Sequence, residues 1–197
     1  MKKVLFVLGL SGSGKSFITT ELIKNYPETF YKLEQYTTRP KRTSFEEEYY
    51  YITKDHFKLI EDKLMAITEV NGNSYGTIPT LAEDRIAIVI VNALGLKNGI
   101  AYVMKNNIAY EIMYVKTDSP FEERENRDLE YEENNIQVVL DSFELVPYAP
   151  YVVVIDSIAT FLERTSIENH KYLSINNSST FPIEINNILV NHICNLF

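Results

Sequence analysis

The chain has 197 residues, of which 45% are hydrophobic and 23% charged, which allows one soluble globular domain with a sizeable core. The longest apolar run, Ile86–Val91, is too short to cross a membrane, and the single cysteine, Cys194, has no internal disulfide partner, so we expect a cytoplasmic protein with no membrane partner. The net charge of −8 argues against nucleic acid as a partner, so any anion must be held by a local basic cluster.

Short apolar runs alternate along the chain with segments of helical periodicity. In chain order, we predict a strand over Val4–Leu8, a helix from Lys15 that ends before Pro27, a strand over Ile86–Val91, a helix opened by Asn92, a strand over Tyr110–Val115, a strand over 171–175 and a closing helix over Ile183–Leu196. The apolar segment 151–163 fits either a strand or a helix, and the polar, aromatic region 31–79 has only weak periodicity. The alternation predicts an α/β fold with a parallel sheet.

The segment GLSGSGKS, residues 9–16, lies between the first predicted strand and the first predicted helix and matches the phosphate-binding P-loop motif. Its glycines let the backbone curl so that N–H groups point at a phosphate, and Lys15 adds a positive charge. The Ser16 hydroxyl is the expected ligand of Mg²⁺, the cofactor that accompanies ATP. The alternative is a glycine-serine turn with a chance lysine. We predict an ATP site made of Gly9, Ser11, Gly12, Ser13, Gly14, Lys15 and Ser16, with Lys15 as a catalytic residue.

A P-loop alone does not distinguish a kinase from a switch or a motor, so a second site for an acceptor is needed. The basic segment YTTRPKR, residues 36–42, is a candidate, because Pro40 prevents a helix through Arg39 and leaves an exposed loop. Such a loop can present the planar side chains of Arg39 and Arg42 to a phosphate. Taken alone, the segment fits a solvated basic turn equally well.

Four motifs, in this order, resemble those of the guanylate kinase family. They are GLSGSGKS, YTTRPKR, the acidic stretch EEEYYYIT with Tyr49 and Tyr51, and GNSYGT at residues 72–77. The later segment IVIVNALGLK is similar to the strand-to-helix segment of the family, with Gly95 at the family's glycine position. The similarity covers residues 3–130, and the combination of TTRxxR with GNxYGT makes it specific.

The resemblance implies a P-loop NTPase-type parallel sheet flanked by helices, with an inserted monophosphate-binding subdomain and a helical lid. On this division the core comprises residues 1–33, 80–118 and 145–197, the insert 34–79 and the lid 119–144. The implied reaction is in-line transfer of the γ-phosphoryl group of ATP to a nucleoside or deoxynucleoside monophosphate by a monomer or homodimer. An ionised phosphate acceptor needs no general base, and all three histidines lie outside the motifs.

The resemblance also assigns residues to the acceptor. Arg39, Arg42, Tyr49 and Tyr75 match the positions that hold the acceptor phosphate, and Thr77 matches a position near the base. Arg39 is expected to act in catalysis as well as in binding.

For the lid and the adenine, the resemblance is less complete. Arg124 and Arg127 match catalytic lid arginines and share a helical face, although salt bridges along FEERENRDLEYEE explain them equally well. An apolar residue near Val139 or Val154 takes the place of a further lid arginine. Asn176, after the last predicted strand, matches a position beside the adenine, and Asp156 is its rival.

The departures from the family pattern concentrate where the family reads guanine. Ungapped alignment puts Ala66 and Asn92 at the positions of the two base-reading carboxylates, and Glu69 replaces the first of them only if the loop is shifted. The first phosphate-loop serine becomes Gln35, and an aspartate near the Mg²⁺ waters becomes Ile90. We therefore include Gln35, Glu69 and Asn92 in the monophosphate site and expect a working kinase with an altered base preference rather than an inactive one.

Two other functions remain open at this point. Guanylate-kinase-like domains also serve as non-catalytic phosphopeptide-binding modules, but those have lost a working P-loop, whereas this chain keeps every P-loop residue. A small-molecule kinase that phosphorylates a sugar phosphate would also need no guanine-reading carboxylates.

Overall fold

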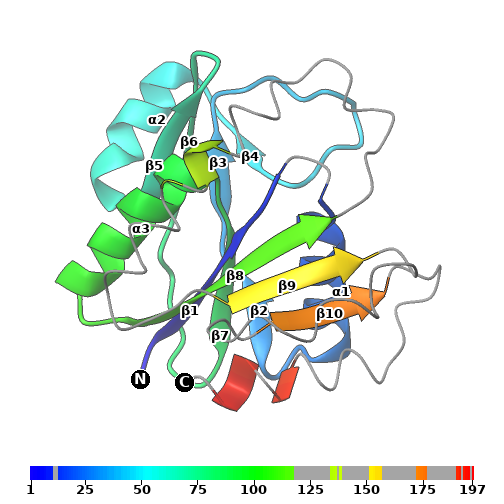
Figure 1. Ribbon diagram of the computed structural model, residues 1–197. Coiled ribbons are helices and arrows are strands. Elements are labelled where there is room, and N and C mark those ends of the chain that lie inside the picture. The colour runs from blue at the N-terminus through cyan, green and yellow to red at the C-terminus, as the bar shows by residue number, and fades with distance from the viewer. Residues whose placement is uncertain are drawn as a thin grey trace.

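The computed structural model describes residues 1–10, 13–117, 134–136, 138, 151–156, 172–176, 190–191, 193–195 and 197. These residues form a six-stranded parallel sheet in the order β10-β9-β8-β1-β7-β2 (Figure 1). Its strands are β1 (Lys3–Leu8), β2 (Phe30–Lys32), β7 (Ile86–Ile90), β8 (Ala109–Thr117), β9 (Tyr151–Asp156) and β10 (Tyr172–Asn176). The order, with connections that cross over, is that of an α/β fold.

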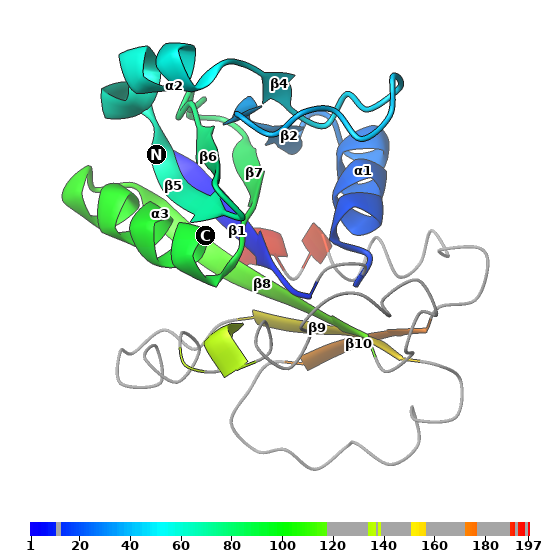
Figure 2. The same cartoon turned by 90° about the horizontal axis from the view of Figure 1, so that it is seen from above.

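The central strand β1 contributes side chains to the hydrophobic core on each face of the large sheet. Residues 4–8 of β1 are fully buried, as expected for a strand that is covered on both faces. Phe6 packs in the cluster that includes α3 (Ala93–Lys105), whereas Leu5 and Val7 pack in the cluster that includes α1 (Lys15–Asn25). Figure 2 shows these two helices on opposite sides of β1. Alternate side chains of one strand therefore fill two separate cores.

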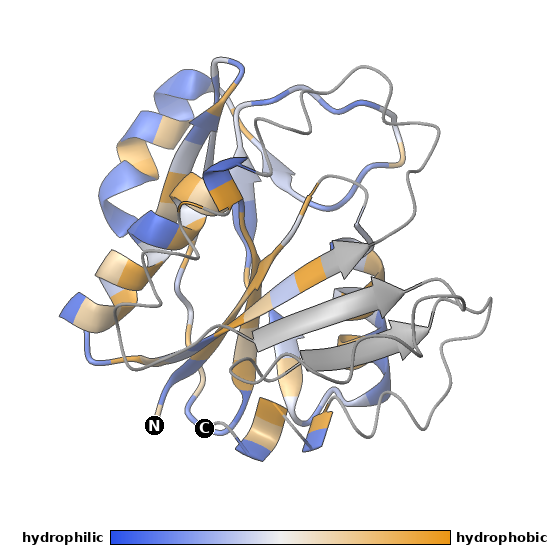
Figure 3. Cartoon of the chain, in the orientation of Figure 1, coloured by the Kyte–Doolittle hydropathy of each residue, from blue (hydrophilic) through white to orange (hydrophobic). Residues whose placement is uncertain are grey.

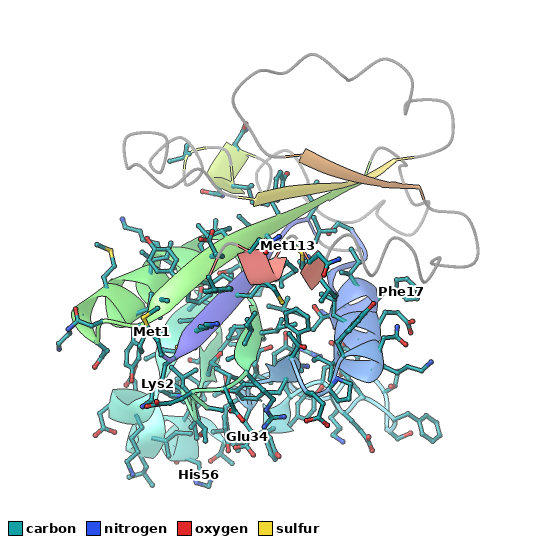
Figure 4. The ribbon with its side chains drawn as sticks, turned by 90° about the horizontal axis from the view of Figure 1, so that it is seen from below. Met1, Lys2, Phe17, Glu34, His56 and Met113 are labelled. Carbon is teal, nitrogen blue, oxygen red and sulfur yellow. The ribbon has the colours of Figure 1, made fainter. Side chains whose placement is uncertain are left out.

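Hydropathy follows the same layers. Figure 3 shows apolar colour along β1 and β7 and polar colour over much of the outer helical surface. Met113 of β8 is fully buried, whereas Phe17, on the first turn of α1, is 54% exposed (Figure 4). No helix among the described residues is both long and apolar enough to span a membrane.

A second sheet lies beside the first and has the order β4-β3-β6-β5 among the described residues. It comprises β3 (Gln35–Thr37), β4 (Tyr50–Tyr51), β5 (Met65–Val70) and β6 (Asn73–Thr77), with the helix α2 (Lys54–Ile60) and a 3₁₀ turn (Glu61–Lys63) between β4 and β5. Asn71 and Gly72, with φ of 51° and 71°, make the two-residue turn of the β5–β6 hairpin, where positive φ favours this pair.

The two faces of the small sheet have different surroundings. A Cβ placed on Gly76 would lie 2.7 Å from Leu64 Cδ1 and 3.3 Å from Phe57 Cζ, so α2 and the turn after it pack tightly on that face. Paired residues of a ladder share a face, and Gln35 pairs with Thr77 while Thr37 pairs with Tyr75. These four residues therefore occupy the opposite face, which is turned toward the large sheet.

The structure confirms the predicted fold class and most of the predicted elements. Segment 151–163 begins as strand β9, and the closing helix is seen at 190–191 and 193–195. Asn176 is the last residue of β10 rather than a residue after it. Strand β2 and the small sheet were not individually predicted, and the division into core, insert and lid stays a prediction.

Candidate active site

The P-loop begins where β1 ends, and two glycines shape it. Gly9 has φ of 153°, and a Cβ there would lie 2.3 Å from the carbonyl oxygen of Val115 and 2.8 Å from Ser13 Oγ, so no side chain fits. Gly14 adopts the left-handed conformation, with φ of 91°, as the residue that precedes α1. Ser11 and Gly12 lie outside the described residues.

The described part of the loop carries polar groups suited to an anion. Lys15 Nζ donates hydrogen bonds to the carbonyl oxygens of Gly9 (2.7 Å) and Leu10 (2.6 Å). Ser13 Oγ is buried and has no hydrogen-bond partner among the described residues. The first turn of α1 contains no acidic residue, so its positive end is not neutralised from within the helix. Ser16 is exposed in the same turn.

Arg39 lies at the centre of the acceptor loop. Its Nη2 lies 2.5 Å from Oε1 of Glu46, and its Nη1 lies 3.2 Å from Oε2 of the same carboxylate. The guanidinium also lies over the rings of Tyr49 (5.9 Å to the centroid) and Tyr51 (5.6 Å). Tyr49 and Tyr75 make an edge-to-face contact with their centroids 5.8 Å apart. The structure thus brings Arg39, Tyr49 and Tyr75 together.

The ionisation of this cluster follows from its contacts. Hydrogen bonds from Arg39 are the main reason that the pKa of Glu46 falls to about 2, and the same bonds raise the pKa of Arg39. Burial, followed by the charge of Glu48, raises the pKa of Tyr49 to about 12. At neutral pH the cluster therefore contains a full ion pair beside the neutral phenol of Tyr49.

Arg42 joins the cluster differently from Arg39. Its backbone N–H donates to Glu46 Oε2 at 2.7 Å, whereas its side chain is exposed, and no ion pair holds it within the described ranges. Glu46 therefore organises both arginine positions of the loop. The sequence showed Glu46 only as part of an acidic run, and nothing in its spacing from Arg39 in an irregular loop indicated the pairing.

A second polar cluster lies at the start of β3, at the opposite end of the ladder from Arg39. Gln35 Nε2 donates to the carbonyl oxygen of Ile90 at 2.9 Å and to Thr77 Oγ1 at 3.4 Å. Asn92 Oδ1 accepts from the backbone N–H of Gly95 at 2.7 Å. Gln35 and Thr77 are buried, whereas Asn92 is exposed.

Thr68 extends this cluster and was not singled out from the sequence. It is 9% exposed, and its Oγ1 accepts a hydrogen bond from Asn92 Nδ2 at 3.4 Å. Thr68 pairs with Tyr75 in the β5–β6 ladder and so shares the face of Tyr75. A β-bulge between Met65 and Thr68 sets this register, and Ala66 within it has φ of 53°. A bulge of this kind cannot be read from residue spacing.

The two positions considered for a base-reading carboxylate, Ala66 and Glu69, bring no acidic side chain to this cluster. Glu69 is exposed and pairs with Ser74, so it lies on the opposite face of the small sheet from Thr68. Ala66 is buried, and its Cβ lies 3.3 Å from the position of a Cβ built on Gly99 of α3. The structure therefore does not bring Glu69 to Asn92.

A cavity of about 420 Å³ borders both clusters. Its lining residues are Lys32, Leu33, Glu34, Gln35, Lys41, Glu47, Glu48, Tyr49 and Tyr50. Gln35 of the second cluster and Tyr49 of the first both contribute to its wall, and its volume lies within the range of small-molecule sites. The described residues contain no group of three or more His, Cys, Asp or Glu side chains able to bind a metal by themselves.

The remaining predicted site residues are only partly described. Arg124 and Arg127 lie outside the described residues, as does Val139. Asn176 and Asp156, the two candidates for a position beside the adenine, end β10 and β9 and are paired with each other in the sheet register. The backbone thus places both candidates at the same edge of the sheet.

Comparison with known proteins points to one family. A family model described as guanylate kinase matches residues 1–157. The guanylate kinase of Helicobacter hepaticus is 32% identical over 101 residues, which cover 47% of this chain and 50% of that protein. That of Geobacter metallireducens is 38% identical over 89 residues, covering 42% and 43%. The chain thus spans about half the length of the curated relatives that it matches.

The fold itself has a match among solved structures. The crystal structure of guanylate kinase from Anaplasma phagocytophilum superimposes with a TM-score of 0.52 at 20% sequence identity. The match covers 78% of this chain and 79% of that one. At this level of identity the likeness concerns the fold alone.

Proposed function

We propose that this chain, which belongs to the guanylate kinase family, transfers the γ-phosphoryl group of ATP to the phosphate of a nucleoside or deoxynucleoside monophosphate. The observation that carries the proposal is the hydrogen bond from Gln35 Nε2 to the carbonyl oxygen of Ile90. Ile90 ends β7 and pairs with Val7 of β1, the strand that leads into the P-loop. This bond supports one continuous site, because it ties the small sheet to the strand edge from which the P-loop extends.

The donor side rests on the P-loop. Backbone N–H groups at the start of α1 would bind the phosphates of ATP, and the Lys15 ammonium would turn from the loop carbonyls to the transferring group. Mg²⁺ bound with a nucleotide needs only one or two protein ligands, and the exposed Ser16 hydroxyl fits that requirement. When bound, Mg²⁺ neutralises charge on the phosphates.

The acceptor side rests on the cluster around Arg39. The Glu46 carboxylate accepts hydrogen bonds from both Nη1 and Nη2 of Arg39, and a phosphate can offer a similar pair of acceptor oxygens. The exposed guanidinium of Arg42 can reach the same anion. Tyr49 remains neutral because its pKa is raised, so its hydroxyl can donate a hydrogen bond to the anion, and Tyr75, whose ring packs against that of Tyr49, carries a second hydroxyl.

The chemistry needs alignment and positive charge rather than a nucleophile from the protein. An oxygen of the acceptor phosphate forms a bond to the γ-phosphorus, while the bond from that phosphorus to the β–γ bridging oxygen breaks. The products are ADP and a nucleoside diphosphate, and no proton has to be removed from the ionised acceptor. Arg124 and Arg127 are proposed to close over the transferred group.

An ATP-coupled assay across all ribo- and deoxyribonucleoside monophosphates tests the proposal, with ribose phosphates included in the same panel. We expect Mg²⁺-dependent ADP formation with at least one nucleoside monophosphate and none with a sugar phosphate. Turnover of ribose phosphates alone would point to a sugar-phosphate kinase. ATP binding without turnover of any acceptor would point to a binding module.

A further inference from the structure

The cluster of Gln35, Thr68, Thr77 and Asn92 consists entirely of neutral side chains. The β3–β6 ladder places it at one end, next to the Gln35–Thr77 pair, and the phosphate-binding candidates Arg39 and Tyr75 toward the other. Gln35 and Arg39 are separated by at most about 13 Å of extended backbone. A nucleoside monophosphate held at its phosphate by Arg39 therefore places its base near these four side chains.

The orientation of the Asn92 amide is fixed by the helix that it caps. The backbone N–H of Gly95 can only donate, so the atom that receives it at 2.7 Å must be Asn92 Oδ1. The Nδ2 group is consequently the free end of the amide, and it makes a long contact of 3.4 Å with Thr68 Oγ1. Asn92 is exposed, so a ligand can approach its side chain.

The Gln35 amide is oriented in the opposite sense. The carbonyl oxygen of Ile90 can only accept, so the atom that contacts it at 2.9 Å must be Gln35 Nε2. A second bond from Nε2 reaches Thr77 Oγ1, which leaves Oε1 as the atom of this side chain that can accept from a ligand. The cluster thus offers one amide acceptor, one amide donor and two hydroxyls.

We propose that Asn92 recognises the base of the acceptor by donating a hydrogen bond to it from Nδ2, and that the site does not recognise the 2-amino group of guanine. The inference rests on the proposed function and names the substrate class: bases with one donor and one acceptor side by side, including hypoxanthine, uracil, thymine and adenine. Guanine also offers such an edge, at O6 and N1–H, but its 2-amino group adds a second donor. Of the four cluster side chains, only Gln35 has an amide oxygen left to accept, and the two hydroxyl oxygens already accept from Gln35 and Asn92. An Asp side chain at position 92 would keep one oxygen for the cap and provide another for that amino group.

The test compares kcat/KM for GMP and for IMP, which lacks only the 2-amino group, in the wild type and in Asn92→Asp. In the wild type we expect the two values to agree within about tenfold. Asn92→Asp keeps a cap oxygen for Gly95 and should raise the ratio of GMP to IMP by about tenfold or more, because a carboxylate accepts strongly from the amino group. Asn107→Asp adds the same charge on the exposed turn after α3 and should leave the ratio unchanged.

A second variant guards against a folding defect. Asn92→Ser also provides a capping oxygen but removes the amide N–H, and its shorter side chain keeps the hydroxyl at the cap. It should therefore lower kcat/KM for both nucleotides while their ratio stays near that of the wild type. A wild-type preference for GMP above a hundredfold, or an Asn92→Asp variant that folds without raising the ratio, would overturn the inference while leaving the proposed kinase activity intact. Failure to phosphorylate any monophosphate would instead remove the proposed function, and this inference with it.

Discussion

Arg39 and Glu46 form a two-point ion pair in which both prongs of the guanidinium contact the two oxygens of one carboxylate, at 2.5 and 3.2 Å. Both side chains are largely buried, with 11% and 13% of their surfaces exposed. A phosphate that binds Arg39 through the same two donors has to displace this carboxylate. An acceptor phosphate therefore has to compete with the Glu46 carboxylate for Arg39.

Glu46→Gln tests that competition. The amide cannot offer two anionic oxygens, so we expect monophosphate to bind several-fold more tightly, because Arg39 no longer exchanges one charged partner for another. Calorimetric titration with the preferred monophosphate measures this effect. Glu61→Gln, at an exposed position of the 3₁₀ turn and outside the cavity wall, should change little. Weaker binding by Glu46→Gln would mean that Glu46 positions Arg39 rather than competing for it.

The same pair predicts a pH dependence of stability. Folding lowers the pKa of Glu46 to about 2, mainly through hydrogen bonds from Arg39. The ionised carboxylate therefore stabilises the folded state above its unfolded pKa of about 4.3, and this contribution is lost as the pH falls toward 2. Urea unfolding from pH 6 to pH 2.5 should show the free energy of unfolding of the wild type falling toward that of Glu46→Gln. Parallel curves for the two proteins over this range would contradict the assignment.

Lys15→Ala should reduce kcat by orders of magnitude, because it removes the charge directed at the transferring phosphoryl group. The fold should survive, since the hydrogen bonds from Lys15 to Gly9 and Leu10 lie within the loop itself. Steady-state kinetics and thermal unfolding measure the two effects. Lys24→Ala, in the exposed last turn of the same helix, is the matched control. Wild-type turnover by a folded Lys15→Ala variant would remove the P-loop from the mechanism.

Arg39→Ala and Arg42→Ala should each weaken use of the monophosphate while barely changing the affinity for ATP. Arg39→Ala should also lower the melting temperature, because it leaves Glu46 without its charged partner, whereas the exposed Arg42 side chain has no ion pair with any residue that the structure describes. Separate titrations with ATP and with monophosphate distinguish the two sites, and Arg85→Ala serves as an arginine control outside both clusters. Equal loss of ATP affinity would move these arginines out of the acceptor site.

Local signals account for what could be predicted from the sequence. The P-loop lies within eight residues whose glycines have backbone requirements of their own, and the helix opened by Asn92 begins at a residue whose side chain does cap it. The buried strand β1 stands out as an uninterrupted apolar run. In each case the residues that form the feature are neighbours in the chain.

The features that escaped prediction depend on partners far along the chain or on irregular backbone. Strand β2 has three residues and is defined by its pairing with β7, more than fifty residues later. The contact of Gln35 with Ile90 crosses from one sheet to the other, and the bulge that brings Thr68 into register has no periodic signature. Neither spacing nor propensity encodes such contacts.

The hydrogen bond between Gln35 and Ile90 also determines how the small sheet can move. It lies close to the covalent connection between the sheets, where the Leu33 N–H donates to the carbonyl oxygen of Ile88 at 3.2 Å. A rotation of the small sheet that preserved both bonds would have its pivot there. Arg39, at the far end of the ladder, would then travel through a longer arc than Gln35 and Thr77. Such a rotation would keep the amides proposed to read the base near the pivot, while the arginine proposed to bind the phosphate moves furthest.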